Sequence, residues 1–238
     1  MLYKVNPFHF DIYHVFQPIM DLSANKVLGY EMLLRSDQMG SPANIFQWAE
    51  EENRLFDLDM YSINKAFDTI NERKSVLNGF HMFINVLPST IENPSYVSSI
   101  QKLKLTHNPD MRQIIFEITE QENTEQFFVC NARVNNVQKQ GFLIALDDLK
   151  SGDFRFSHVT ALQPHVVKLD RYFAFDLAKD IAKQEAIEGI IQSIGDETKL
   201  VLEGLEKEED VAVARELGIR FGQGFVLGKP KPLTYYLA

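Results

Sequence analysis

The chain has 238 residues, of which 45% are hydrophobic and 24% charged, a composition typical of globular proteins. Its formal net charge of −9 at pH 7 argues against a general nucleic-acid or anionic-membrane surface. The amino terminus has no signal-peptide pattern, no apolar run is long enough to span a membrane, and the single cysteine, Cys130, permits no internal disulfide. We therefore expect a cytoplasmic protein with one domain over residues 1–238.

Two strands are expected near the amino terminus, at about residues 14–20 and 27–34. The link between them, residues 21–26, is too short for a crossover helix, since parallel neighbours need roughly a dozen connecting residues. We therefore expect an antiparallel hairpin. Helical patterns follow at 44–53 and 56–72, the second with an apolar stripe at the spacing of a helix. The stripe consists of Phe56, Met60, Ile63, Phe67 and Ile70.

The rest of the chain alternates between strand and helix patterns. Strands are expected at about 80–86, 113–118, 141–148, 165–170, 199–203 and 219–225. Helices are expected from Pro88, over 125–140, around Phe156, and over 178–194 and 208–217. Eight strands with intervening helices predict an α/β protein with a modified (β/α)8 TIM-like barrel whose first strand is antiparallel.

Polar side chains stand at or near the ends of these strands. Asp147 and Asp148 follow the apolar run from Gly141 to Leu146, and two ionised carboxylates near a core require a cation beside them. A lone acid at a strand end more often just begins a solvated loop, but several successive strands show the same arrangement. Because barrel active sites form at the carboxyl ends of the strands, we expect one converging polar site. Its members are Glu31, Asn85, Glu117, Asp147, Asp148, Lys168, Glu203 and Gln223.

Hard oxygen ligands of this kind are typical of Mg²⁺ or Mn²⁺ sites. Two such metals can activate water for attack on a phosphodiester or phosphomonoester, with Asp147 bridging them. Lys168 could then orient the water or offset charge, and Glu203 could accept a proton or bind metal. The histidines and the cysteine lack the spacing of a zinc site.

Three of these residues have simpler interpretations when each is taken alone. Asn85 could be a loop residue before a helix, and Gln223 a buried amide. Lys168 could pair with Asp170 inside the barrel, or form a Schiff base as in aldolase-like barrels. The surrounding carboxylates disfavour the Schiff base, because they raise the pKa of a lysine.

An ordered set of short motifs resembles the EAL domain, the bacterial cyclic-di-GMP phosphodiesterase. No single motif is specific, but their order and spacing agree over nearly the whole chain. The motifs are Phe16-Gln17-Pro18-Ile19, Gly29-Tyr30-Glu31-Met32-Leu33-Leu34-Arg35, Asn85 with Pro88, Glu117-Ile118-Thr119-Glu120, Ala145-Leu146-Asp147-Asp148, Lys168-Leu169-Asp170-Arg171, Glu203-Gly204-Leu205-Glu206 and Gln223-Gly224-Phe225.

The resemblance implies an irregular barrel that uses Mg²⁺ or Mn²⁺ to hydrolyse cyclic di-GMP to linear pGpG. It implies that Lys168 and Glu203 act on the nucleophilic water. It further implies a homodimer and, as no sensor or diguanylate cyclase domain is attached, a regulatory protein partner. The metal ligands implied are Glu31, Asn85, Glu117 and Asp147 for one ion and Asp147 with Asp148 for the second. The nucleotide site implied consists of Gln17, Arg35, Glu206 and Gln223.

The chain departs from the family pattern in three places. Met32 occupies the middle of the Glu-Ala-Leu signature, and Leu87 stands where a serine is expected. After the paired aspartates, Leu149-Lys150-Ser151-Gly152-Asp153 replaces Phe-Gly-Thr-Gly-Tyr in the loop that couples dimerisation to binding of the second metal. The divergent loop 149–153 supports two further hypotheses, a non-catalytic cyclic-di-GMP receptor and a scaffold with a vestigial pocket. An enolase-like lyase fits the carboxylates alone, but not the ordered motifs.

Overall fold

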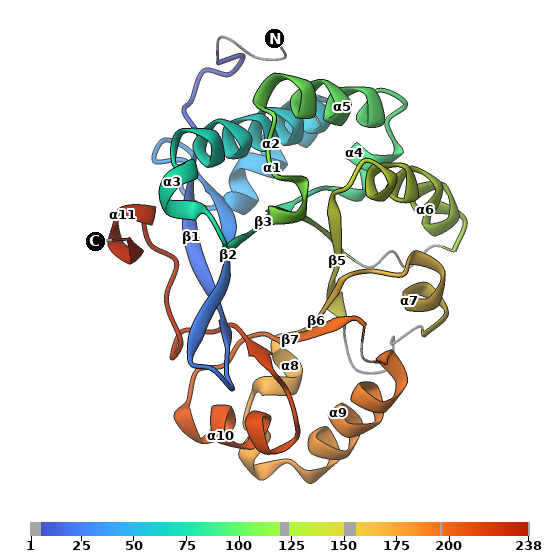
Figure 1. Cartoon of the computed structure of the whole chain (residues 1–238). Coiled ribbons are helices and arrows are strands. Elements are labelled where there is room, and N and C mark those ends of the chain that lie inside the picture. Colours follow the sequence, from blue (N-terminus) through green and yellow to red (C-terminus); the bar gives the residue numbers. More distant parts are fainter. Residues whose placement is uncertain (1–5, 120–123, 150–155, 196, 238) are drawn as a thin grey trace.

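Eight strands close into a barrel in the order of the sequence (Figure 1). The structure is a computed structural model that describes residues 6–119, 124–149, 156–195 and 197–237, with only the backbone of 119, 124–130 and 156–158. β1 runs antiparallel to both β2 and β8, and the remaining pairs are parallel, which confirms the predicted barrel. The strands are β1 (Tyr13–Asp21), β2 (Lys26–Arg35), β3 (His81–Asn85), β4 (Ile114–Thr119), β5 (Leu143–Leu149), β6 (Val166–Leu169), β7 (Lys199–Leu202) and β8 (Phe221–Gly222).

Helices surround most of the barrel (Figure 1). None of the helices in the described ranges is both long and apolar enough to cross a membrane. The α-helices are α1 (Pro42–Glu51), α2 (Leu55–Glu72), α3 (Lys74–Leu77), α4 (Pro88–Glu92), α5 (Tyr96–His107), α6 (Thr124–Lys139), α7 (Phe156–Leu162), α8 (Arg171–Ala174), α9 (Ile181–Ile194), α10 (Glu208–Glu216) and α11 (Leu233–Tyr236). Two 3-10 turns, η1 (Met111–Gln113) and η2 (Leu177–Lys179), complete the set.

Several elements differ from the sequence-based prediction, among them α5, α9 and β8. α5 was not expected, although it buries Tyr96, Ile100 and Leu103 at helical spacing. The predicted helix over 178–194 is interrupted at Asp180, whose side chain accepts the Lys183 N–H and begins α9. The predicted strand over 219–225 is reduced to β8, because the chain beyond Gly222 bonds to the segment after β7.

The β1–β2 hairpin has no crossover helix, so the carboxyl-terminal segment packs beside it instead. Phe16 and Lys231 exchange backbone hydrogen bonds of 2.7 and 3.0 Å. The ring of Tyr236 lies 5.6 Å from that of Tyr30, centroid to centroid. Figure 1 shows α11 outside this hairpin, where it completes the cover of the barrel.

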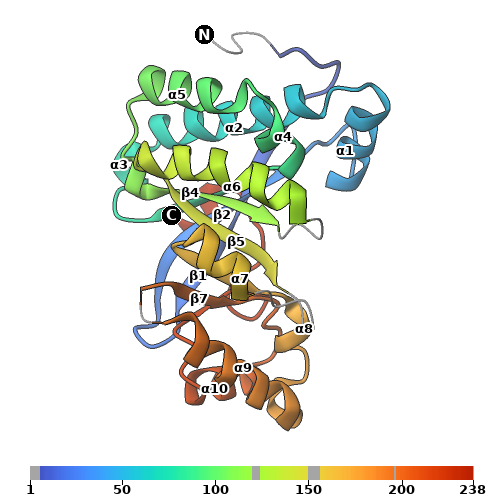
Figure 2. The ribbon, with the colours of Figure 1, turned by 90° about the vertical axis from the view of Figure 1, so that its right-hand side faces the viewer.

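The parallel strands direct their carboxyl ends to one face of the barrel. In Figure 2 the arrowheads of β4 and β5 point to the side on which α1 and α8 lie. Inside the barrel, below that face, one residue from each of seven strands forms an apolar cluster. These residues are Ile19, Phe83, Ile115, Ala145, Val166, Val201 and Phe221.

Candidate functional site

The barrel interior changes from apolar to polar within one layer of side chains. Side chains two residues apart in a strand face the same side, so the residues two positions closer to the carboxyl face also point inward. β2 shows the same two-residue spacing. Its Gly29 pairs with Ile19 at the level of the apolar cluster, and its Glu31 pairs with Gln17 one layer closer to the carboxyl face. The polar layer consists of Gln17, Glu31, Asn85, Glu117, Asp147, Lys168, Glu203 and Gln223. The strand alternation therefore brings the predicted residues together.

Lys168 lies at the centre of this layer and is fully buried. Its Nζ is 2.6 Å from Glu203, 2.7 Å from Glu117, 3.4 Å from Asp147 and 3.5 Å from Glu31. Burial opposes its charge, but these carboxylates outweigh burial and hold the pKa of Lys168 well above its ordinary value. A charged ammonium is a poor nucleophile, which argues against the Schiff-base interpretation.

The pairing of Lys168 with Asp170 is not formed. The Asp170 carboxylate instead accepts the Tyr172 N–H at 2.8 Å and caps the start of α8. Lys168 therefore belongs to the carboxylate cluster rather than to an isolated ion pair.

Burial raises the pKa of several carboxyl groups around this ammonium. The pKa of Glu117 lies well above its usual value, that of Asp147 is raised, and that of Glu203 rises to about 8. In each case burial is the main cause, and the negative charge of neighbouring carboxylates adds to it. If all four were ionised, the carboxylates around Lys168 would carry more negative charge than one ammonium can compensate.

Glu31 is the exception, because two amides and the ammonium stabilise its charge. Asn85 Nδ2 donates to its Oε1 at 3.0 Å, and Gln223 Nε2 donates to its Oε2 at 2.7 Å. Burial alone would raise the pKa of Glu31, but Lys168 and these two hydrogen bonds lower it below the usual value. Glu31 is thus held in its ionised form.

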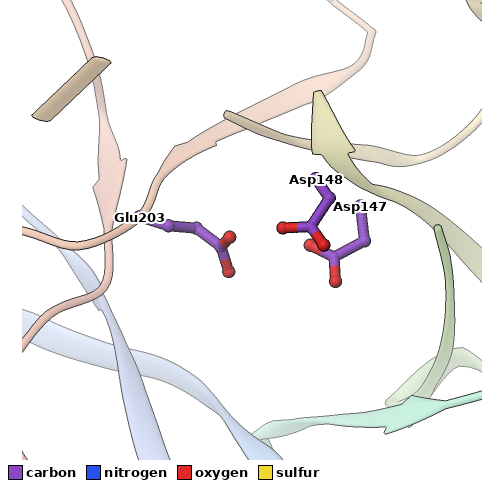
Figure 3. A group of neighbouring side chains, drawn as sticks. All are labelled: Asp147, Asp148 and Glu203. Carbon is purple, nitrogen blue, oxygen red and sulfur yellow. The ribbon is translucent and has the colours of Figure 1, made fainter. Parts of the chain in front are cut away.

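The paired aspartates reach the same site through an irregularity in β5. Successive residues of a regular strand face opposite sides, so Asp147 and Asp148 would normally point apart. Between Leu146 and Leu149 the register of β5 against β6 shifts, and Asp148 has a left-handed φ of 58°. Figure 3 shows both carboxylates facing Glu203. Such bulges often redirect side chains beside active sites.

The cluster fits a divalent cation by the chemistry of its donors. Asp147, Asp148 and Glu203 each offer an oxygen within 4.8 Å of the other two. Glu117 Oε2 is buried without a hydrogen-bond donor among the described residues, whereas Asp147 Oδ1 lies 3.4 Å from the Lys168 ammonium. Buried carboxylate oxygens without donors are costly unless a cation neutralises them, and Mg²⁺ and Mn²⁺ prefer such oxygen ligands.

A cavity of about 300 Å³ opens beside the cluster. Of the predicted nucleotide-binding residues, Gln17, Glu206 and Gln223 line it. Arg35 is not among the described lining residues; it ends β2, and its Nη1 donates to the Leu34 carbonyl at 2.7 Å. The lining residues are Gln17, Glu31, Asp148, Asp170, Arg171, Glu203, Gly204, Glu206, Gln223, Gly224 and Phe225.

Asp170, Arg171 and Phe225 are lining residues that were not predicted as part of the site. Each lies two or three residues from a predicted site residue within the same sequence motif, which was the available signal. Of the divergent loop, residues 150–153 lie outside the described residues.

Comparisons with known proteins agree with this architecture. The EAL domain model matches residues 9–230. The chain is 28% identical over 225 residues to the probable cyclic di-GMP phosphodiesterase PdeD of Escherichia coli (strain K12). This match covers 91% of this chain and 41% of that protein. The chain is 30% identical over 230 residues to the cyclic di-GMP phosphodiesterase PdeA of Borreliella burgdorferi, covering 92% of this chain and 33% of that protein. The chain thus spans less than half the length of these relatives.

The fold also matches solved structures of BlrP1 from Klebsiella pneumoniae. In its calcium and cyclic-di-GMP complex the TM-score is 0.85 with 26% identity, covering 95% of this chain and 58% of that one. In a manganese and cyclic-di-GMP complex the TM-score is 0.85 with 25% identity, covering 97% and 57%. Both comparisons extend over almost the whole barrel.

Proposed function

The chain belongs to the EAL domain family, and we propose that it hydrolyses cyclic di-GMP to linear pGpG with Mg²⁺ or Mn²⁺. The observation that carries the proposal is the carboxylate cluster around Lys168, with a buried Glu117 oxygen that lacks a donor among the described residues. Relatives named as cyclic di-GMP phosphodiesterases and the metal-containing nucleotide complexes of BlrP1 support it.

In this proposal the polar layer holds the metals. When bound, divalent cations supply Lewis acidity that favours deprotonation of water and stabilises charge on the phosphoryl oxygens. The residues that would hold them are Glu31, Asn85, Glu117, Asp147 and Asp148. The raised pKa values of the buried carboxyl groups mean that metal binding displaces protons, so affinity should increase with pH.

Lys168 and Glu203 would act on the attacking water. The ammonium of Lys168 donates hydrogen bonds and offsets negative charge at the phosphorus centre. Glu203 lies 2.6 Å from this ammonium and faces Asp147 and Asp148 (Figure 3), so in its ionised form it can accept the water proton. Both side chains project from strand ends, so the barrel fixes their separation.

The cavity would receive the nucleotide. Gln17, Glu206 and Gln223 line it and offer amide and carboxylate groups to the bases and sugars. Arg35 would contact a phosphate by rotating away from the Leu34 carbonyl, because its guanidinium offers a forked pair of donors. The homodimer, the regulatory partner and the cytoplasmic location stay predictions.

The test is product formation from cyclic di-GMP with Mg²⁺ or Mn²⁺, followed by chromatography. We expect pGpG from the native protein and at least 100-fold less from Glu31→Ala, because this variant loses a ligand that the amides hold ionised. Glu50→Ala, at an exposed position of α1, is the matched control and should keep full turnover. Unchanged turnover in Glu31→Ala would refute the assignment. Tight nucleotide binding with Ca²⁺ and no product with Mg²⁺ or Mn²⁺ would make the protein a receptor.

A further inference from the structure

Asp59 on α2 is a buried carboxylate outside the cluster around Lys168. It is 4% exposed and lies between Leu58 and Met60, which are both fully buried. Among the described residues no cation forms an ion pair with it, and burial raises its pKa to about 6. A carboxylate in such surroundings is costly to the fold, so its contacts are of interest.

The carboxylate reaches from α2 to the corner that follows β3, which consists of residues 85–88. Asp59 Oδ2 accepts the N–H of Leu87 at 2.9 Å. Leu87 precedes α4 as its N-cap residue, and its own side chain has no oxygen that could cap the helix. Asp59 therefore supplies, from another element, the acceptor for the backbone N–H of this N-cap residue.

The opposite side of the same corner is held by the barrel. The N–H of Val86 donates to the carbonyl of Glu117 at 2.9 Å. Two successive amides are thus fixed, one by β4 and one by α2. Asn85 immediately precedes them, is exposed, and donates to Glu31 at 3.0 Å. Because its side chain is not enclosed by packing, its direction depends on the backbone of this corner.

We propose that Asp59 is a positioning residue for the metal site: it fixes the corner formed by residues 85–88 and so directs the Asn85 amide toward Glu31. The inference rests on the proposed function, which assigns Asn85 and Glu31 to metal binding. Asp59 itself touches neither metal nor nucleotide and acts through the Leu87 N–H.

The test is a calorimetric titration with Mn²⁺ in the absence of nucleotide. Asp59→Ala removes the acceptor, and we expect Mn²⁺ to bind about tenfold more weakly, as when residues that orient metal ligands are removed. Asp59→Asn keeps an acceptor oxygen of the same reach and should stay within about threefold of the native protein. Asp57→Ala is the matched control, since Asp57 lies on the same helix but contacts Arg54, and it should bind Mn²⁺ normally.

A double-variant cycle separates positioning from a general structural role. In an Asn85→Ala background, Asp59→Ala should cause no further loss of Mn²⁺ affinity, because its effect passes through Asn85. Additive losses, or a folded Asp59→Ala protein with native affinity, would overturn the inference. If Asp59→Ala does not fold, Asp59→Glu takes its place: the displaced carboxylate should weaken Mn²⁺ binding while Asp59→Asn does not, and equal affinities would overturn it.

The same titrations distinguish this inference from the proposed function. A native protein that binds Mn²⁺, loses affinity on Asp59→Ala and makes no pGpG would retain the positioning role and lose the hydrolase assignment. Normal hydrolysis by the native protein, with native Mn²⁺ affinity in Asp59→Ala, would retain the hydrolase assignment and overturn the positioning role. A native protein that binds no divalent cation would overturn both.

Discussion

At the scale of single residues, the site is defined by one ammonium enclosed by four carboxylates. Lys168 is fully buried, and its closest partners, Glu117 and Glu203, have raised pKa values because they are buried together. The lysine is thus the internal counter-charge that allows acidic groups to remain at the barrel mouth. Removal of this charge should affect the fold as well as activity.

Lys168→Met should lower the free energy of unfolding by about 3–5 kcal/mol at pH 8, because it leaves buried carboxylates without their partner. The deficit should shrink at pH 5, where Glu203, whose pKa is raised to about 8, is protonated in the folded protein and no longer repels its neighbours. Urea unfolding at the two pH values measures both effects. A variant as stable as the native protein at pH 8 would contradict this account of Lys168.

Asp59 has the opposite effect to Lys168, because its negative charge lowers the stability of the fold. Its pKa rises from 3.8 to about 6 on folding, so the fold loses stability as the pH rises from about 4 to 6. Two pKa units correspond to roughly 3 kcal/mol. Asp59→Asn should therefore be more stable than the native protein at pH 8, by up to about 3 kcal/mol, with little gain at pH 4. Urea unfolding at both values measures this difference, and an equal gain at both would rule out ionisation as the cause.

At the scale of elements, the segments after β7 and β8 form one wall of the cavity. Leu205 N–H donates to the Gln223 carbonyl at 3.1 Å, and Val226 N–H donates to the Leu205 carbonyl at 3.2 Å. Gly224 makes this close approach possible, because a Cβ there would lie 2.0 Å from the Leu205 oxygen. Glu206 and Gln223 line the cavity on either side of this contact.

Gly224→Ala should force these segments apart and weaken cyclic-di-GMP binding at least tenfold, with a stability loss of about 1–3 kcal/mol, as for overpacked sites. Calorimetric titration with nucleotide and Ca²⁺ measures the binding. Gly189→Ala on α9, where a Cβ would meet nothing within 4 Å, serves as the control. Native affinity in Gly224→Ala would show that this wall does not contribute to the nucleotide site.

Much of this arrangement could be predicted from sequence, because it follows from strand alternation and connection length. The short link before Lys26 required an antiparallel hairpin, and apolar runs ending in Asp147 or Glu203 marked the carboxyl face. The left-handed Asp148 could not be predicted, because the bulge depends on pairing with β6. The burial of Asp59 was not predicted either, because a single acidic residue in a helical pattern does not indicate that its side chain faces the core.

At the scale of the whole molecule, charge is distributed unevenly between the barrel mouth and the rest of the chain. The net charge is −9, and the cavity wall contains five acidic residues but, among the described residues, one arginine. A divalent cation that binds only the folded state stabilises it by mass action. Metal should therefore act on the stability of the entire barrel.

Saturating Mn²⁺ should raise the melting temperature of the native protein, since a ligand at 100 times its Kd contributes about 2.7 kcal/mol. Differential scanning fluorimetry measures the shift, with NaCl of equal ionic strength as the control for screening. Glu31→Ala should show a much smaller shift. An equal rise with NaCl, or in Glu31→Ala, would mean that the ion acts elsewhere on the surface.

In the proposed reaction, this barrel directs a water molecule to one phosphodiester of cyclic di-GMP. The most direct measurement is a single-turnover reaction with Mn²⁺ in ¹⁸O-labelled water, with the product analysed by mass spectrometry. We expect linear pGpG that carries one ¹⁸O in its terminal phosphate. Intact cyclic di-GMP at the end of the reaction, or a linear product without the label, would contradict it.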